Sequence, residues 1–201
     1  MTWIKTIPYE EADQKLKKLY DRVKGPDGQI DNILAAHSLR PHSLTGHMAL
    51  YKNVLHNQNN TLPKWYLETI GVLVSILNKC DYCVQHHYHG LKKLLNDDAQ
   101  SELILQALKS GYYAKQFEGK EYAGLRYAKE LTLMAHRINE INMDMLRSSG
   151  LDDGEILEIN QVTAYFNYAN RTVLGLGVNI DGEVLGLSPN DDGNEENWGH
   201  K

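Results

Sequence analysis

The sequence is poor in several residue types, and each scarcity excludes a class of structure or partner. Two cysteines and five prolines among 201 residues exclude a disulfide-rich scaffold and a proline-rich, low-complexity chain. The longest apolar run, IGVLVSIL at 70–77, is too short to span a bilayer. The net charge is −5 and no block of Lys or Arg is present, so nothing marks a nucleic-acid surface. We therefore expect neither nucleic acid nor a membrane as a partner.

What remains is an ordinary globular composition, with 42% apolar and 23% charged residues. The N-terminus, MTWIKTIPYEEADQ, lacks the apolar stretch of a secretory signal, so we predict a soluble, cytoplasmic protein. The length suits one domain, which we place at residues 1–182. Residues 183–201 are rich in Asn, Asp, Gly and Glu, and we expect them to form a flexible polar tail.

The pattern of apolar residues is helical nearly throughout. Apolar positions recur every three or four residues, and no alternation of period two is long enough to predict a strand. Asp97 or Asp98 is a suitable N-cap, and Gly111 and Gly150 are suited to helix ends. The predicted fold is all-α, with helices over about 12–23, 33–36, 44–55, 63–77, 80–96, 98–108, 119–138, 141–150 and 151–178.

Both cysteines lie in the stretch NKCDYCVQHHYHG at 78–90, beside three histidines. Cys80 and Cys83 are three positions apart and His87 follows four positions later, so a helix would bring all three to one face. A helix N-terminus and a nearby imidazole both favour the reactive thiolate over the thiol. The pattern is therefore typical of thiol chemistry.

Glu68 lies in the apolar segment that precedes this stretch, where an unpaired carboxylate would be unfavourable. On one unbroken helix it would be about 18 Å from Cys80, because each residue adds about 1.5 Å. A turn at 77–79 would fold the second helix back on the first. We then expect His87 to be the partner of Glu68.

Three chemistries are open for the cysteine pair. A structural disulfide is disfavoured in a reducing compartment. A zinc site would usually need a second cysteine pair. Cys80, Cys83 and His87, together with Glu68 or His89, could still form a zinc site of catalytic type. A redox-active thiol pair needs no further ligands, and we favour it.

Glu68, Cys80, Cys83 and His87 are separated by eleven, two and three intervening residues. This pattern resembles the core motif of the alkyl hydroperoxidase D (AhpD)-like proteins of the carboxymuconolactone decarboxylase superfamily. The segments VSILNKCDYCVQHH and EILEINQVTAYFNYANRTVLGLGV are similar to the peroxidase-related branch of that family. The resemblance covers most of residues 1–180.

The resemblance implies an all-α helical bundle, with the CxxC pair at the N-terminus of a core helix, that assembles as a homotrimer or hexamer. It also implies a thiol-dependent peroxidase that reduces hydrogen peroxide or an organic hydroperoxide. Cys83 would be the attacking thiol, Cys80 the resolving thiol, and His87 and Glu68 a proton relay. No bound cofactor or metal is implied, and an external dithiol, on a lipoylated or thioredoxin-like protein, would reduce the pair.

The sequence departs from the family motif at Tyr82, where the best-understood members have a histidine between the cysteines. His86 could substitute, but it points about 100° away from His87 around a helix. We expect His86 and His89 to be surface or packing residues, and Asn167 and Asn170 to serve helix packing or a subunit contact.

Two other functions remain open. One is a decarboxylase or hydrolase of the carboxymuconolactone decarboxylase type, which would not need the cysteines. The other is a redox sensor in which the Cys80–Cys83 disulfide changes the affinity for a partner.

Overall fold

The computed structural model describes residues 2–190, 194 and 197–201. Its regular structure is helical throughout those residues, apart from one isolated bridge between Pro189 and His200. The all-α prediction is confirmed. Within the same part of the chain, no helix has both the length and the apolar character needed to cross a membrane.

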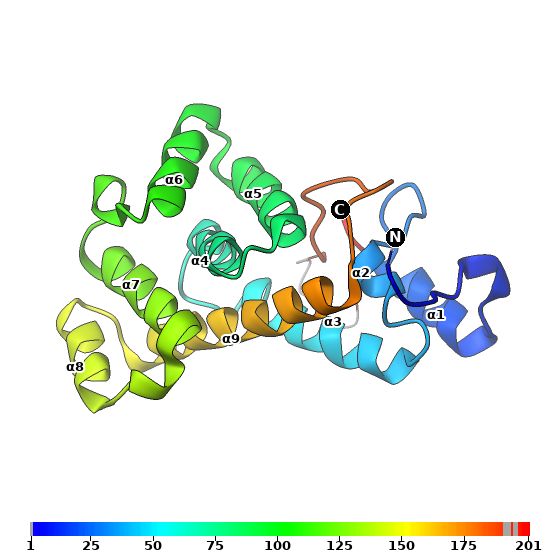
Figure 1. Cartoon of the computed structure of the whole chain (residues 1–201), viewed down its shortest axis with the longest axis horizontal. Coiled ribbons are helices and arrows are strands. Elements are labelled where there is room, and N and C mark those ends of the chain that lie inside the picture. The colour runs from blue at the N-terminus through cyan, green and yellow to red at the C-terminus, as the bar shows by residue number, and fades with distance from the viewer. Residues whose placement is uncertain (1, 191–193, 195–196) are drawn as a thin grey trace.

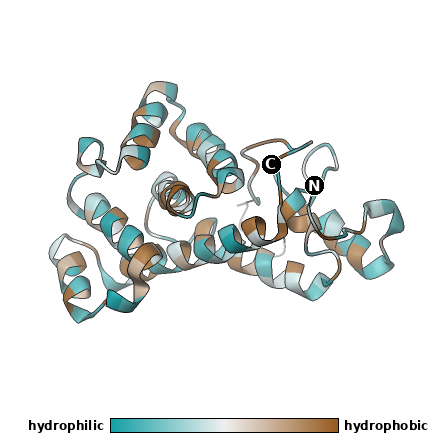
Figure 2. Ribbon diagram, in the orientation of Figure 1, coloured by the Kyte–Doolittle hydropathy of each residue, from teal (hydrophilic) through white to brown (hydrophobic). Residues whose placement is uncertain are grey.

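Helix α4 (Lys64–Leu77) lies at the centre of the molecule. It packs against α5 (Asp81–Leu95), α7 (Gly119–Met134) and α9 (Asp153–Leu176). Figure 1 shows α4 seen end-on between these neighbours, with the long α9 running beneath it. Ten consecutive residues of α4, from Tyr66 to Ser75, are buried, because the helix is covered on every side. In Figure 2 the outer helices carry teal stretches toward solvent.

The remaining helices flank this centre. The N-terminal end of the molecule carries α1, α2 and α3, whereas α6 and α8 lie beyond α5 and α7 (Figure 1). Their bounds are Gln14–Val23 (α1), Asn32–Ala35 (α2), Pro41–Leu55 (α3), Asp98–Ser110 (α6) and Glu140–Ser148 (α8), with 3₁₀ turns at Tyr9–Glu11, Tyr113–Lys115 and Ala135–Arg137. Each α-helix overlaps a predicted one. The 3₁₀ turns were not predicted.

Helix ends follow the sequence signals. Asp97 caps α6 by accepting a hydrogen bond from the Gln100 amide, and α6 ends at Gly111, whose φ of 75° favours glycine. The side chain of Asp152 caps α9 and that of Glu155 bonds back to the amide of Asp152, a capping box. These local signals fix where the helices that frame the site begin.

The α4–α9 contact is unusually close at Gly71. A β-carbon added to Gly71 would lie 2.3 Å from Cζ of Phe166, closer than a carbon contact allows. The Phe166 ring therefore occupies the space that a side chain would take, and it is fully buried. This packing sets the distance between the two helices that support the cysteine pair.

The segment after Gly182 contacts the body of the protein at several described residues. Lys93 Nζ donates to the carbonyl of Gly186 over 2.8 Å, and the ring of His200 contacts the carbonyl of Val23 at 2.8 Å. Residues 191–193 and 195–196 of the predicted tail lie outside the described residues. The domain boundary and the flexibility of the tail stay predictions.

Candidate functional site

A tight turn between α4 and α5 positions the cysteine pair. Asn78 ends α4, Lys79 adopts the left-handed conformation with φ of 58°, and the Cys80 amide donates to the carbonyl of Ser75 over 2.9 Å. The positive φ reverses the chain without a glycine. As the sequence predicted, α5 folds back on α4, and Cys80 becomes the N-cap of α5.

The two cysteines form a buried, reduced pair. Their sulfurs lie 3.2 Å apart, and the side chains are 0% and 3% exposed for Cys80 and Cys83. The hydrogen bond between them lowers the pKa of Cys80, whereas the same bond and burial raise the pKa of Cys83. Cys80 is therefore the more acidic of the two thiols.

Glu68 and His87 form the predicted carboxylate–imidazole contact. Oε2 of Glu68 lies 2.8 Å from Nδ1 of His87, and its Oε1 lies 3.9 Å from Nε2 of His56. The Phe166 ring packs edge-on against His87, with centroids 4.5 Å apart. A carboxylate on Nδ1 fixes the proton there, which leaves Nε2 of His87 as a proton acceptor.

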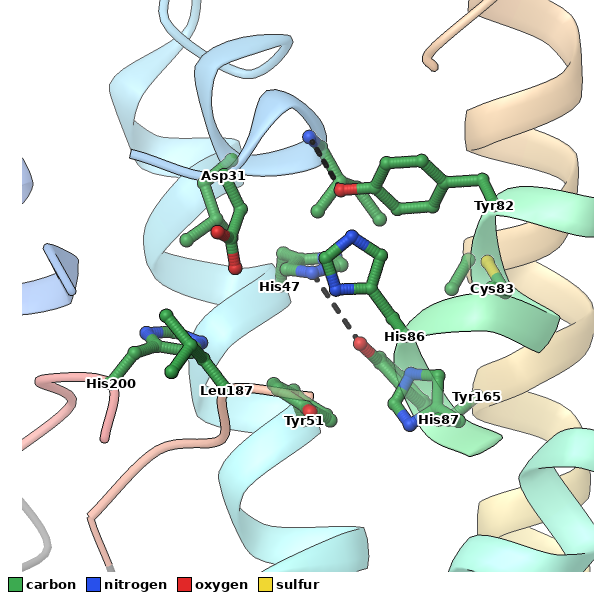
Figure 3. A pocket seen from close by; sticks show the side chains of 13 residues that line it. Asp31, His47, Tyr51, Tyr82, Cys83, His86, His87, Tyr165, Leu187 and His200 are labelled. Atoms are coloured by element: carbon green, nitrogen blue, oxygen red, sulfur yellow. Dashed lines mark hydrogen bonds between the residues drawn. The ribbon is translucent and has the colours of Figure 1, made fainter. Parts of the chain in front are cut away.

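A small cavity of about 40 Å³ opens beside the pair, with room for a few water-sized molecules. Cys83 lines it, but Cys80 does not. Figure 3 shows Tyr82, Cys83, His86 and His87 on α5, facing Asp31 just before α2 and His47 and Tyr51 of α3. The complete lining is Asp31, Ile33, Leu34, His47, Tyr51, Tyr82, Cys83, His86, His87, Tyr165, Ala169, Leu187 and His200.

A second carboxylate, Glu183, contacts two other residues of α5. Its Oε2 lies 3.0 Å from Nε2 of His86, and its Oε1 accepts the Tyr82 hydroxyl over 2.9 Å and the backbone N–H of Asn32. The Glu183 side chain is 3% exposed. One buried carboxylate thus bridges three groups, on His86, Tyr82 and Asn32. His86 is therefore a buried cavity residue, and Tyr82 supports it instead of acting as a base.

Titratable groups from two further segments face His86. Asp31, the residue before α2, lines the cavity, and so does His200 near the C-terminus. Burial raises the pKa of Asp31 and lowers that of His200, so both groups favour their neutral forms.

The wall opposite α5 is built of neutral rings. Burial lowers the pKa of His47 to about 3, and its Nε2 lies 3.4 Å from the hydroxyl of Tyr165 (Figure 3). Tyr165 in turn stacks on Tyr51, with centroids 5.3 Å apart. These rings give the cavity hydroxyl and imidazole groups without adding charge.

Asn170 of α9 connects the turn to the thiols. It is fully buried, donates to Ser75 Oγ over 3.1 Å and accepts from Asn78 over 3.0 Å. A hydrogen bond from Asn170 to Cys83 lowers the pKa of that thiol, against the larger effects that raise it. The helix-packing role expected for Asn167 and Asn170 is confirmed, since Asn78 also bonds to Asn167 at 3.1 Å.

Four predicted site residues, Glu68, Cys80, Cys83 and His87, thus lie together at the α4–α5 turn. The sequence analysis missed Glu183, because no spacing signal links residues 97 positions apart in the chain. Across the described ranges, no group of three or more His, Cys, Asp and Glu side chains is arranged to hold a metal ion.

No protein-family model matches the sequence, and no curated protein matches it either. Solved structures do resemble it. An uncharacterised peroxidase-related protein from Silicibacter sp. TM1040 is 25% identical, with a TM-score of 0.72 over 89% of this chain and 91% of that one. A protein from Ralstonia eutropha JMP134, described as an alkylhydroperoxidase AhpD core, is 21% identical, with a TM-score of 0.73 over 89% and 91%.

Other similar structures carry different descriptions. A protein of unknown function from Agrobacterium tumefaciens, described as a putative antioxidant defence protein AhpD, is 23% identical, with a TM-score of 0.60 over 71% of this chain and 93% of that one. The debrominase Bmp8, solved as a cysteine-to-alanine variant in complex with 2,3,4-tribromopyrrole, is 15% identical, with a TM-score of 0.69 over 90% and 93%. The chain therefore has the AhpD-like fold of these peroxidase-related proteins, which agrees with the resemblance seen in the sequence.

Proposed function

We propose that the protein is a thiol-dependent peroxidase that reduces hydrogen peroxide or a small organic hydroperoxide through Cys83 and Cys80. The observation that carries the proposal is the arrangement of the two sulfurs. They lie 3.2 Å apart, one facing a cavity and the other buried behind it. An S–S bond is about 2.05 Å long, so a short movement would join them.

In the first step, the hydroperoxide enters the cavity and the sulfur of Cys83 attacks its terminal oxygen. The Cys83 proton passes to Nε2 of His87, directly or through water, and Glu68 stabilises the resulting imidazolium through Nδ1. The O–O bond breaks, the leaving oxygen takes a proton from water or a protonated group in the cavity and departs as an alcohol or water, and Cys83 becomes a sulfenic acid.

In the second step, the Cys80 thiolate attacks the sulfenic sulfur. The S–O bond breaks, hydroxide leaves as water after taking the proton from His87, and the Cys80–Cys83 disulfide forms. The lowered pKa of Cys80, due to its hydrogen bond with Cys83, keeps this sulfur ready as the resolving nucleophile. An external dithiol, on a lipoylated or thioredoxin-like carrier, then returns both thiols by exchange.

We also expect the chain to act as a homo-oligomer, a trimer or a hexamer. Large apolar side chains are exposed on α8 and α9, where Ile141, Met145 and Leu157 are 70%, 57% and 55% exposed. Exposed apolar side chains that form one patch often mark a protein interface, and we expect these to form one. Sedimentation velocity of the full chain measures the assembly directly.

The test of the function is peroxide consumption by the full chain with a dithiol such as dihydrolipoamide or dithiothreitol. We expect catalytic turnover, and a loss of about two mass units after one equivalent of peroxide without reductant, as two thiols become a disulfide. The Cys83→Ser variant should abolish both. Full turnover by that variant contradicts the proposal.

The same assay separates the alternatives. A redox sensor would form the disulfide quickly but turn over negligibly with any dithiol. A decarboxylase of the carboxymuconolactone type would keep its activity in a variant that lacks both cysteines. Either result would replace the peroxidase assignment.

A further inference from the structure

A second carboxylate–imidazole pair, Glu183–His86, reaches the cavity through the ring of His86, and the His87 ring of the Glu68–His87 pair lines the same cavity. We propose that His86 is a catalytic residue of the peroxidase reaction, the donor of the proton that the leaving oxygen takes, and that Glu183 positions it. The inference rests on the proposed function and assigns the two pairs opposite tasks.

The helix geometry places both imidazoles one turn from Cys83. His86 and His87 follow Cys83 by three and four positions, and residues at both spacings are neighbours on a helix surface. Successive residues are about 100° apart around the axis, so the two rings flank the thiol on different sides. One peroxide molecule at Cys83 would therefore lie between an acceptor and a donor.

A contact with a carboxylate allows an imidazole to accept or, in its charged form, to donate a proton, and we assign the donating form to His86 because His87 already takes the Cys83 proton. Its Nε2 lies 3.0 Å from the Glu183 carboxylate, and Nδ1 is the ring nitrogen left to meet a cavity ligand. Figure 3 shows the ring reaching into the cavity between Asp31 and Cys83. The buried carboxylate balances the charge of an imidazolium, as Tyr82 and the Asn32 amide hold it in place.

The surrounding groups do not compete for this role. Asp31 and His200 also face His86, and burial favours the neutral form of each. Tyr82 donates its hydroxyl to Glu183 and is not free to protonate a ligand. Among the described residues that line the cavity, His86 is thus the second imidazole, besides His87, that is paired with a buried carboxylate.

Protons and electrons balance around the cycle. As Cys83 loses its proton to His87 and two electrons to the peroxide, the leaving oxygen takes a proton from the His86 imidazolium. Disulfide formation then returns the His87 proton to the hydroxide that leaves as water. Reduction by a dithiol releases two protons, of which one restores the Cys83 thiol and the other recharges His86.

The test compares two oxidants whose leaving groups differ in their need for a proton. Hydrogen peroxide expels hydroxide, a strong base that needs a proton as it leaves. Peracetic acid expels acetate, a weak base that leaves without one. The rate of disulfide formation is measured with each by acid-quenched flow and intact mass for the full chain and its variants.

We expect His86→Gln to slow the reaction with hydrogen peroxide by about 100-fold and that with peracetic acid by less than about threefold, since general acid catalysis typically contributes that much. Glu183→Gln, which keeps an acceptor for Tyr82 but cannot balance an imidazolium, should shift the ratio of the two rates in the same direction. The matched control is His89→Gln on the same helix. Its ring bonds to the Gln85 carbonyl at 2.8 Å and does not line the cavity, so its ratio should equal that of the wild type.

The ratio also guards against a structural artefact, because partial unfolding lowers both rates equally and leaves their ratio unchanged. An equal loss with both oxidants, or no loss, in His86→Gln overturns the role of His86. A wild-type ratio in Glu183→Gln overturns the role of Glu183. If the wild type reacts with neither oxidant, the proposed function itself fails.

Discussion

The carboxylate of Glu68 lies 2.8 Å from Nδ1 of His87, although the two residues are 19 positions apart on different helices. The turn at 78–80 creates this contact by folding α5 back on α4. The side chain of Glu68 is 4% exposed and that of His87 is 14% exposed, so little water competes with the bond. Glu68 of α4 thus orients the imidazole of His87, which lies one turn from Cys83 on α5.

Replacing Glu68 by Gln should slow the oxidation of Cys83 by about 100-fold, because the imidazolium of His87 loses its balancing charge. The amide keeps the shape of the carboxylate, so the fold should be retained. Stopped mixing with hydrogen peroxide, followed by thiol quantification, measures the rate. Glu102→Gln is the control, since Glu102 bonds to the Tyr88 hydroxyl at 3.1 Å, outside the cavity. An unchanged rate in Glu68→Gln would contradict the relay.

Gly71→Ala should destabilise the fold by about 1–3 kcal/mol, since the new methyl group would overlap Phe166 and overpack the α4–α9 contact. In an open helix the same change would stabilise by up to about 1 kcal/mol. Gly46→Ala on α3, with nothing within 4 Å of the added carbon, tests that expectation. Urea unfolding measures the change in the free energy of unfolding of each variant. If Gly71→Ala stabilised the fold as Gly46→Ala does, the α4–α9 contact would be looser than described.

Asn170→Ala should lower the free energy of unfolding by about 1–3 kcal/mol, because the buried Ser75 and the half-buried Asn78 each lose a hydrogen bond. It should also raise the pKa of Cys83, since the bond from Asn170 lowers it. Asn167→Ala removes another bond of Asn78 and should leave the thiol unaffected. Thiol alkylation rates against pH distinguish the two variants. Identical thiol titrations would count against the Asn170–Cys83 contact.

His47 should make the fold sensitive to mild acid. Burial lowers its pKa to about 3 in the folded chain, with His37 and His200 adding to the effect. The unfolded chain takes up this proton near pH 6.5. Between those values the unfolded state binds more protons, so stability is full above about pH 6.5 and falls by about 2 kcal/mol from there to pH 5.

The measurement is urea unfolding of the wild type and His47→Gln at pH 7.5 and pH 5. The loss of stability between the two pH values should be smaller in the variant by about 2 kcal/mol. Titration of Asp31, whose raised pKa acts in the opposite direction, is common to both proteins and cancels in the difference. An identical pH dependence would mean that His47 is protonated in the folded chain.

The sequence predicts those features of the site that depend on neighbours in the chain. The CxxC spacing, the position of His87 and the turn after Leu77 are local, and an isolated carboxylate in an apolar helix demands a partner. Glu183 was out of reach, because its contacts with Tyr82 and His86 join residues 101 and 97 positions apart. The contact that buries His86 was out of reach for the same reason, since Glu183 lies in a segment expected to be a tail.

The helices could be predicted because amphipathic spacing and caps act within a few residues. Their packing around α4 depends instead on contacts such as Gly71 with Phe166, which join distant segments and leave no periodic signal. The cavity is a product of that packing, and the sequence alone does not reveal its size.

The central claim is that Cys83, the sulfur that faces the cavity, attacks the peroxide, although Cys80 has the lowered pKa. The most direct measurement is the trapping of sulfenic acid with dimedone in the Cys80→Ser and Cys83→Ser variants after one equivalent of hydrogen peroxide, read by peptide mass spectrometry. We predict a dimedone adduct on Cys83 in Cys80→Ser and none on Cys80 in Cys83→Ser. An adduct on Cys80 in Cys83→Ser, formed at the wild-type rate of oxidation, would contradict the account.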